Sequence, residues 1–234
     1  MVFFSNFSVL SHSLWIPPYP PLLNCLSMLK RTIGRSLLAM LVITGLAGTV
    51  NNDSLSKAER KYAVNLMKDT KEEVLGSVRG LSAAQLDFKS RPDQWSVKEC
   101  MYHIAVSEKN LWEMFETSMK GPANPEKRKE IKFTDEQIVN MMKDRTSKFK
   151  TFPNYEPAST GYESFATAMD DFKKTRTEHI RHIKSSTEDM RNHVVQMGFG
   201  PIDCYQLCLM IASHTNRHVQ QINEMKASQG FPAK

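Results

Sequence analysis

From about residue 55 to the C-terminus, apolar side chains recur in several long segments at the three- to four-residue spacing of amphipathic helices. In the first segment, Tyr62, Leu66 and Val74 follow this spacing. No segment alternates between apolar and polar residues for more than a few positions, as a strand would. Such helices bury their apolar stripes against one another. The sequence therefore predicts an all-α fold: a four-helix bundle with an additional short helix between the second and third long helices.

Start and stop signals divide these segments. A capping box, S-x-x-E, at residues 96–99 starts the second long helix, and the Gly-Pro pair at 121–122 ends it. A second cap at residues 134–137 starts the short helix, which we expect over 134–150. The segment 187–203 contains two glycines and a proline, so we expect a loop there before the last helix.

Composition limits the function classes. The chain has 234 residues, of which 41% are hydrophobic and 24% charged, as in an ordinary soluble protein. Its formal net charge is +6, but no cluster of Lys and Arg is interleaved with aromatic residues. We therefore expect no nucleic-acid binding. The four cysteines form no C-x-x-C pair. We interpret Cys204 and Cys208, which would lie one helical turn apart, as small buried hydrophobic residues.

The first fifty residues differ from the rest because they contain no Asp or Glu. Residues 28–50 have a basic start, a short apolar run from Leu37 to Ala47 and an exit of small residues, which is typical of a secretory signal peptide. The alternative is an uncleaved N-terminal membrane anchor. Residues 1–27 fit neither pattern, and we interpret them as an upstream over-extension that precedes the true start at Met28. The expected location is exported or periplasmic.

Two histidines lie within the apolar stripe of the last helix. With His214 at 0° on a helical projection, His218 falls at about 40° and Leu207 at about 20°. The i, i+4 spacing lets two imidazoles reach one metal ion from one helix, provided that a facing helix supplies a third ligand. The alternative is a pair of core histidines satisfied by neighbouring groups. We expect this stripe to face the bundle interior.

His103 is the best candidate for the third ligand. It lies at the edge of the apolar face of the second long helix, on the side shared with Ser107 and Asn110, which we expect to line a pocket. The other histidines are weaker candidates. His179 and His182 alternate with Arg and Lys and are expected on a solvated face, whereas His193 lies in a loop that could approach the site.

Two motifs resemble the DinB-like family of four-helix-bundle proteins. One is a Trp-Ser pair that opens the second helix seven residues before a histidine, and the other is H-x-x-R-H-x-x-Q-I in the last helix. The matching residues here are Trp95, Ser96, His103, His214, Arg217, His218 and Gln221. The resemblance covers residues 55–228, the whole expected domain. It implies one divalent metal ion held by His103, His214 and His218.

Three neutral imidazoles suit Zn²⁺, Ni²⁺ or Fe²⁺, with zinc the default by availability. They leave a coordination position open, where a metal ion can activate water or a thiol. The resulting hypotheses are a metal-dependent hydrolase and a transferase, each acting on a small molecule. Some family relatives are transferases that use bacillithiol or mycothiol, and because these thiols are cytosolic an exported protein favours the hydrolase. The alternative is a non-enzymatic metal-containing stress-response or binding module.

The helical positions of four further residues suggest candidate roles for them. Glu108 is a candidate general base, although it lies at about 140° from His103 on the helix. Arg217 could bind a substrate anion, but we favour packing or an ion pair with a neighbouring helix. Trp112 and Met101 lie on the far side of their helix from His103. They could form the surface of a homodimer, but we expect them to pack against the short helix at 134–150.

Overall fold

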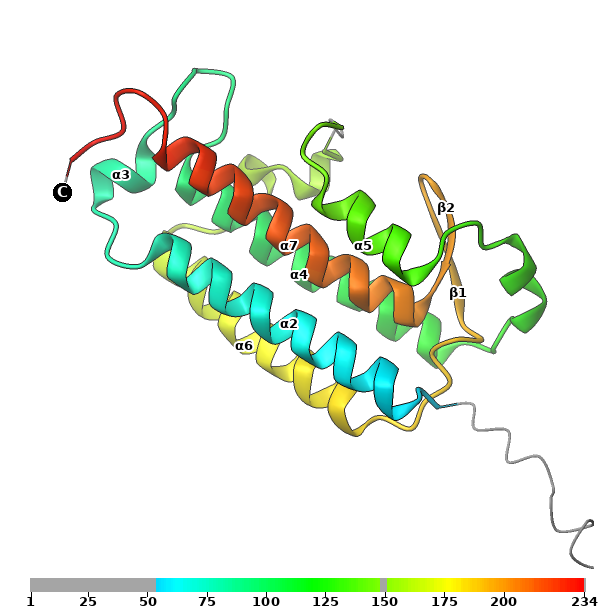
Figure 1. Ribbon diagram of the computed structural model, residues 1–234. Coiled ribbons are helices and arrows are strands. Elements are labelled where there is room, and N and C mark those ends of the chain that lie inside the picture. Colours follow the sequence, from blue (N-terminus) through cyan, green and yellow to red (C-terminus); the bar gives the residue numbers. More distant parts are fainter. Residues whose placement is uncertain (1–53, 148–150, 234) are drawn as a thin grey trace, which may run out of the picture. The chain divides into compact units, whose positions relative to one another are not determined.

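Four long helices form the framework of the domain (Figure 1). They are α2 (Lys57–Val78), α4 (Val97–Lys120), α6 (Phe165–Ser185) and α7 (Cys204–Lys226). Both α2 and α4 pack against α6 and α7, so α2 lies diagonally across from α4. The shorter helix α5 (Asp135–Lys143) lies between α4 and α6 in sequence and packs against α7. The predicted all-α four-helix bundle with its additional short helix is confirmed.

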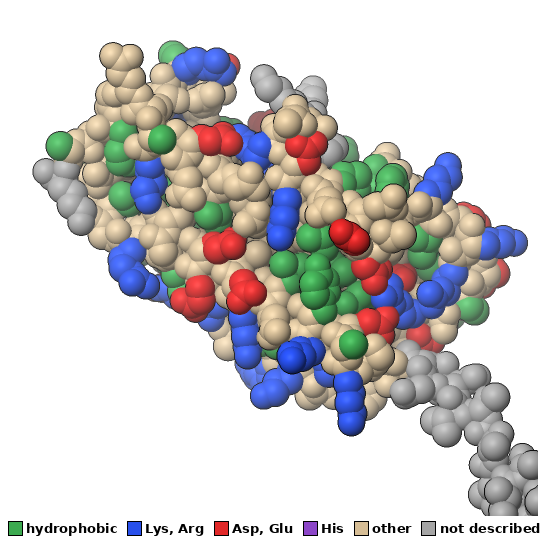
Figure 2. Space-filling view, in the orientation of Figure 1, with side chains coloured by type: hydrophobic (Ala, Val, Ile, Leu, Met, Phe, Trp, Pro, Cys, Tyr) green, Lys and Arg blue, Asp and Glu red, His purple; other side chains and the backbone are tan. Residues whose placement is uncertain are grey.

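The computed structural model describes residues 54–147 and 151–233. The predicted over-extension at residues 1–27 and the predicted signal peptide or anchor at 28–50 lie outside the described residues. Among the helices of the described part, none is both long enough and apolar enough to cross a bilayer. Figure 2 shows acidic and basic side chains interspersed on the face that carries α2, α5 and α7.

Capping residues start the helices where the sequence predicts. The Ser96 hydroxyl accepts a hydrogen bond from the backbone N–H of Glu99, and the Glu99 carboxylate accepts one from the backbone N–H of Ser96. The same reciprocal pair joins Thr134 and Gln137 at the start of α5. These bonds satisfy N–H groups that have no partner within the first helical turn. The predicted caps are therefore confirmed.

Helix α5 ends at Lys143, so its predicted extent of 134–150 is wrong. The carboxylate of Asp144 accepts hydrogen bonds from the backbone N–H and the hydroxyl of Thr146, which turns the chain. The guanidinium of Arg217 in α7 donates to the backbone carbonyls of Asp144 and Ser147. The end of α5 is thus bonded to α7, a contact that no periodicity within residues 134–150 could indicate.

The segment 187–203 is not only a loop. It contains a short antiparallel hairpin made of β1 (Val194–Met197) and β2 (Gly200–Asp203), in which Met197 pairs with Gly200. Gly200 has a φ of 133°, a conformation that side-chain-bearing residues rarely adopt. Strands of four residues are too short to show a clear alternation, which explains why the sequence pattern missed them.

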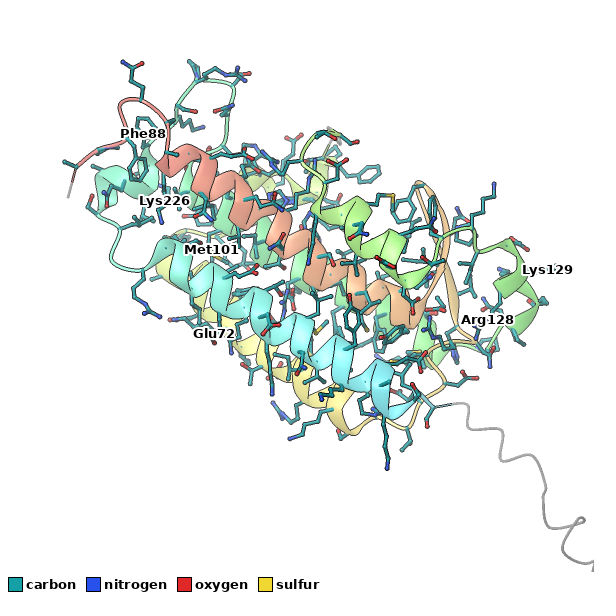
Figure 3. All side chains as sticks on the ribbon, viewed as in Figure 1. Glu72, Phe88, Met101, Arg128, Lys129 and Lys226 are labelled. Atoms are coloured by element: carbon teal, nitrogen blue, oxygen red, sulfur yellow. The ribbon has the colours of Figure 1, made fainter. Side chains whose placement is uncertain are left out.

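The connections between the long helices contain further short elements. The segment between α2 and α4 includes the helix α3 (Ala83–Asp87), which begins with a Ser82–Gln85 capping box. Three 3₁₀ turns complete the described elements. They are η1 (Pro125–Glu130), η2 (Pro153–Tyr155) and η3 (Pro157–Ser159). Figure 3 labels Arg128 and Lys129 in η1, at the opposite end of the domain from Phe88, which follows α3.

Trp112 and Met101 pack against α6 and not against α5, so the expected packing is wrong. The indole of Trp112 stacks on the imidazole of His179 in α6, with ring centroids 3.8 Å apart. Met101, labelled in Figure 3, is fully buried in an apolar cluster that includes Phe172 of α6. Both side chains are buried, so they offer no surface to a partner copy. Helix α5 instead covers α7.

Cys100, Cys204 and Cys208 are free and buried, which confirms the prediction for Cys204 and Cys208. Burial raises the pKa of the Cys100 thiol to about 12 and that of Cys204 to about 11. These thiols therefore stay protonated and serve as packing groups. The fourth cysteine, Cys25, lies outside the described residues.

Candidate metal centre

Three histidine side chains from two helices meet at one point. His103 comes from α4, and His214 and His218 come from successive turns of α7. The Nε2 atom of His214 lies 3.2 Å from Nε2 of His103 and 3.1 Å from Nε2 of His218. Within the described part of the chain, this is the one group of three or more His, Cys, Asp or Glu residues whose donor atoms have already converged.

Hydrogen bonds on the opposite ring edges orient two of these imidazoles. Nδ1 of His103 donates to the backbone carbonyl of Tyr155 at 2.7 Å, and Nδ1 of His218 donates to Oε1 of Gln221 at 3.1 Å. Because an oxygen of this kind can only accept, each Nδ1 carries the proton. The Nε2 atoms of His103 and His218 then present lone pairs toward the point where the three rings meet.

The spacing of these nitrogens fits a shared metal ion. Two nitrogens bound to Zn²⁺ at about 2.0–2.1 Å with a tetrahedral angle lie about 3.4 Å apart. The distances of 3.1 and 3.2 Å from His214 to its two neighbours are within a few tenths of an ångström of that value. Three imidazoles without a carboxylate or thiolate form a donor set suited to Zn²⁺, Ni²⁺ or Fe²⁺. The residues therefore fit a divalent metal ion.

Burial keeps the three imidazoles in the neutral form that binds metals. It lowers the pKa of His103 to about 4, against a smaller opposing effect of the Tyr155 carbonyl. It also lowers the pKa of His214 to about 3, and His103 and Arg217 add to this shift. The pKa of His218 falls well below its ordinary value for the same main reason. A proton therefore competes weakly for these nitrogens near neutral pH.

Trp95 and Ser107 complete the surroundings of the histidines. The indole of Trp95 lies against the His103 ring, with centroids 4.8 Å apart, and stacks on His218 at 6.1 Å. The hydroxyl of Ser107, one turn along α4, lies 3.4 Å from Nε2 of His103. The Trp-Ser pair of the sequence motif thus has two functions, because Trp95 covers the imidazoles while Ser96 caps the helix that carries His103.

The histidines form one wall of a cavity of about 440 Å³. Most of the remaining lining is apolar and comes from α4, α5, the hairpin and the segment around η2. Its apolar members are Leu111, Met114, Met142, Phe152, Met197 and Phe199. A second cavity of about 690 Å³ adjoins it and shares Met114, Tyr155 and Gln196. The histidines thus face a cavity on the side of the α4–α7 pair that carries α5. We expected them to face the space enclosed by the four long helices, and this expectation is wrong.

Most of the other candidate residues lie away from the histidines. Ser107 lines their cavity as expected, whereas Asn110 lines the adjoining one. His193 is buried elsewhere and donates to the carbonyl of Asp189. Arg217 lines the cavity, but its guanidinium bonds to backbone carbonyls at the end of α5. The sequence interpretation of Arg217 as a packing residue that contacts a neighbouring helix is therefore confirmed.

Glu108 is not available as a general base. Its carboxylate accepts two hydrogen bonds from the guanidinium of Arg176 in α6, at 2.7 and 2.6 Å, and a third from Nδ1 of His179. These partners outweigh the effect of burial and lower the pKa of Glu108 to about 2. The carboxylate is held between the helices, and among the described residues that line the histidine cavity there is no Asp or Glu.

Arg176 joins all four long helices through its five N–H groups. Besides Glu108, it donates to the carbonyl of Met67 and the hydroxyl of Thr70 in α2, and to the hydroxyl of Thr215 in α7. Every donor of the guanidinium is therefore satisfied, although the residue is fully buried. Sequence reasoning missed this cluster and wrongly placed His179 on a solvated face, because a basic residue in an amphipathic helix usually marks its solvated side.

Comparison with known proteins agrees with this architecture. The model of the DinB superfamily matches residues 66–222. The uncharacterized protein YuaE of Bacillus subtilis (strain 168) is 22% identical over 165 residues, which cover 70% of this chain and 96% of that protein. The solved structure of YfiT from Bacillus subtilis, described as a probable metal-dependent hydrolase with an unusual four-helix bundle topology, has a TM-score of 0.53 at 14% identity. The match covers 76% of this chain and 92% of YfiT.

Proposed function

This chain belongs to the DinB superfamily, and on that premise we propose that it is a metal-dependent hydrolase in which His103, His214 and His218 hold one divalent ion. The observation that carries the proposal is the convergence of three Nε2 atoms at the wall of a cavity. Zinc is the proposed ion because it is the common partner of such a donor set.

A divalent ion held by His103, His214 and His218 would supply a Lewis acid beside the cavity. The protein groups around it bind and orient. The Tyr155 carbonyl and the Gln221 amide hold the His103 and His218 rings, and the Trp95 indole covers them. These contacts hold the metal-binding edges of the imidazoles at the wall of the cavity, where a bound ion would be within reach of a substrate.

The lining of the cavity indicates the class of substrate. Its six apolar side chains contact the part of the substrate next to the reacting bond and exclude water from it. Phe152, 67% exposed at the rim, extends this apolar surface outward. The adjoining cavity adds Asn110 and Asn154, which can form hydrogen bonds with a more distant part of a longer substrate. We propose a small molecule that is apolar beside the bond to be cleaved.

Water is the proposed nucleophile. The described lining of the cavity contains no cysteine and no carboxylate, so the protein there supplies neither a thiolate nor an acyl-forming carboxylate. YfiT, which shares the fold, is described as a probable metal-dependent hydrolase. A transferase would require a thiol from outside the protein. The proposed export of the chain through residues 28–50 separates it from cytosolic thiols.

The test combines metal analysis with activity screens on the full chain. We expect one equivalent of zinc in the purified protein and turnover in an esterase or amidase panel that rises with the apolar character of the substrate. His103→Ala should lose both. Turnover that depends on an added low-molecular-weight thiol would identify a transferase instead. Metal uptake without any turnover would identify a binding module, and the absence of metal uptake would overturn the metal centre itself.

N-terminal sequencing of the protein secreted or released from its host tests the proposed export. We expect a processed N-terminus that lies within or just after residues 28–50. Retention of the whole segment in a membrane fraction would support the anchor, and an unprocessed soluble protein in the cytosol would contradict export.

A further inference from the structure

The two adjoining cavities form one groove along α4. His103 and Ser107 line the first cavity, of about 440 Å³. Thr117, further along the same helix, lines the second cavity, of about 690 Å³, and Met114 lines both. These four positions fall within about 80° of one another around the helix axis, so they form one face of α4. A ligand that occupies the first cavity can therefore extend along α4 into the second.

The second cavity is polar, whereas most of the first is apolar. Its hydrogen-bonding side chains come from α4, from the hairpin and from the segment around η2. They include those of Asn110, Glu113, Thr117, Asn154 and Gln196. Among the described residues that line this cavity, Glu113 is the one charged side chain, and none is a lysine or an arginine. The second cavity therefore favours a cationic group over an anionic one.

The carboxylate of Glu113 is not neutralised by the protein. In the part of the chain that the structure describes, it forms no hydrogen bond and no ion pair. Glu116, three residues later on α4, is by contrast paired with Trp112 and Lys120. Burial raises the pKa of Tyr155, and the negative charge of Glu113 raises it further. Because Tyr155 lines both cavities, the charge of Glu113 acts at the place where they meet.

We infer that the substrate carries an ammonium group, which Glu113 binds in the second cavity while the apolar part of the molecule occupies the first. The inference rests on the proposed function, because it assigns the reacting bond to the three-histidine centre. An ammonium group has three N–H donors. The Glu113 carboxylate can accept one, and the amide oxygens of Asn110 and Asn154 belong to the same cavity as further acceptors. A substrate carboxylate or phosphate would instead be repelled by Glu113.

The length of the groove limits the shape of such a substrate. His103 and Glu113 lie on the same helix, and the rise of α4 between them is about 15 Å. The apolar side chains of Leu111 and Met114 line the first cavity between these two ends. The ammonium group and the reacting bond are therefore separated by an apolar spacer of similar length. The substrate class is an ester or amide with a long apolar chain that ends in an amine.

The test compares octylamine with octan-1-ol, which share an apolar tail and differ in the charge of the head group. Calorimetry on the full chain, with and without Zn²⁺, measures both affinities without any turnover. We expect octylamine to bind about fivefold more tightly, which is the size of an ion pair that solvent partly screens. The preference should decrease as NaCl is raised to about 0.5 M, because salt screens exposed charges.

Two glutamate variants locate the ammonium group. Glu113→Gln should abolish the preference for octylamine and leave the affinity for octan-1-ol unchanged. Glu178→Gln is the matched control, because Glu113 also borders a groove between α4 and α6, and Glu178 lines that groove but not the second cavity. This control should keep the preference. Loss of the preference in Glu178→Gln alone would assign the amine to the other groove and overturn the inference. Equal binding of the two probes by the wild type would overturn it as well.

These outcomes are separate from those that test the hydrolase. If metal uptake or turnover fails while the preference that depends on Glu113 persists, the hydrolase is wrong and the groove binds an amine for another purpose. If neutral apolar esters are hydrolysed while the two probes bind equally, the hydrolase stands and the inference fails. Where turnover is found, Glu113→Gln should raise KM for an amine-bearing ester about fivefold, with kcat unchanged.

Discussion

Consecutive residues of α4 enter two different polar clusters. Ser107 lies beside His103 and faces the cavity between α4 and α7, whereas Glu108 points between the helices to Arg176. On α7 the division repeats, because His214 joins the first cluster and the next residue, Thr215, joins the second. Two buried polar groups thus lie back to back within one bundle.

The two clusters differ in whether their polar atoms are all paired within the protein. In the Arg176 cluster, every N–H of the guanidinium has an acceptor and both carboxylate oxygens of Glu108 have donors. In the histidine cluster, the rings are oriented from behind and their Nε2 atoms converge on one another. Complete pairing makes a structural element, and convergent lone pairs make a place for a cation. Groups that are equally buried can therefore have opposite functions.

The largest expected effect comes from breaking the Arg176 cluster. Glu108→Ala leaves a buried guanidinium without its carboxylate, so the free energy of unfolding should fall by about 3–5 kcal/mol. Urea denaturation measures this change. The double variant Glu108→Leu, Arg176→Met, which removes both charges, should recover most of the loss. If Glu108→Ala were as stable as the wild type, the cluster would have no structural role.

Removing a member of the histidine cluster should act on metal binding instead. His103→Ala should weaken Zn²⁺ binding by more than about a hundredfold, because two imidazoles from one helix remain. Competition with a chromophoric chelator measures the affinity. His193→Ala is the matched control, since that histidine is buried but bonds to the carbonyl of Asp189 away from the cavity. Equal affinities of the two variants would contradict the assignment.

In the metal-free protein, the two clusters should affect the free energy of unfolding at different pH values. The unfolded chain protonates the three imidazoles near pH 6.5, whereas the folded chain resists protonation down to about pH 4 at His103 and about pH 3 at His214. The unfolded state then binds more protons, so stability decreases as the pH falls below about 6.5. We expect a loss of about 1–2 kcal/mol in the free energy of unfolding between pH 7 and 6.

Glu108 should contribute no pH dependence in that interval. Its pKa is lowered to about 2, so the stability that its ion pair supplies is present above about pH 4.5 and is lost as the pH falls toward 2. Urea denaturation at successive pH values tests both statements. His218→Gln should reduce the loss between pH 7 and 6. An unchanged slope in that variant would mean that other groups cause it.

The smallest expected effect concerns the support of one imidazole. Gln221→Leu removes the acceptor of the His218 Nδ1 proton and should weaken Zn²⁺ binding about tenfold, with little change in the free energy of unfolding. Gln220→Leu is the matched control, because Gln220 bonds to the carbonyl of Lys143. Affinity that stays at the wild-type value in Gln221→Leu would show that packing alone orients the ring.

Local patterns in the sequence determined the helices and the positions of the three histidines. The capping boxes at Ser96 and Thr134 act within one helical turn, so they can be recognised from the sequence and are confirmed. The i, i+4 spacing of His214 and His218 is also local. His103 could be named because it lies at the edge of an apolar face, although its convergence with the other two required the bundle.

Only the tertiary structure decided which partner each buried polar side chain contacts. Glu108 and Arg176 are 68 residues apart in sequence, and the acceptor of His103 Nδ1 is a backbone carbonyl 52 residues away. The end of α5 likewise depends on Arg217, which lies 73 residues after Asp144 and 70 residues after Ser147. Helical periodicity describes the face of one helix, but the neighbour that covers this face depends on the packing of all the helices. The sequence by itself therefore determined which side chains are placed on each helix, and the packing decided which of them meet as an ion pair, as a candidate metal centre or as the lining of a cavity.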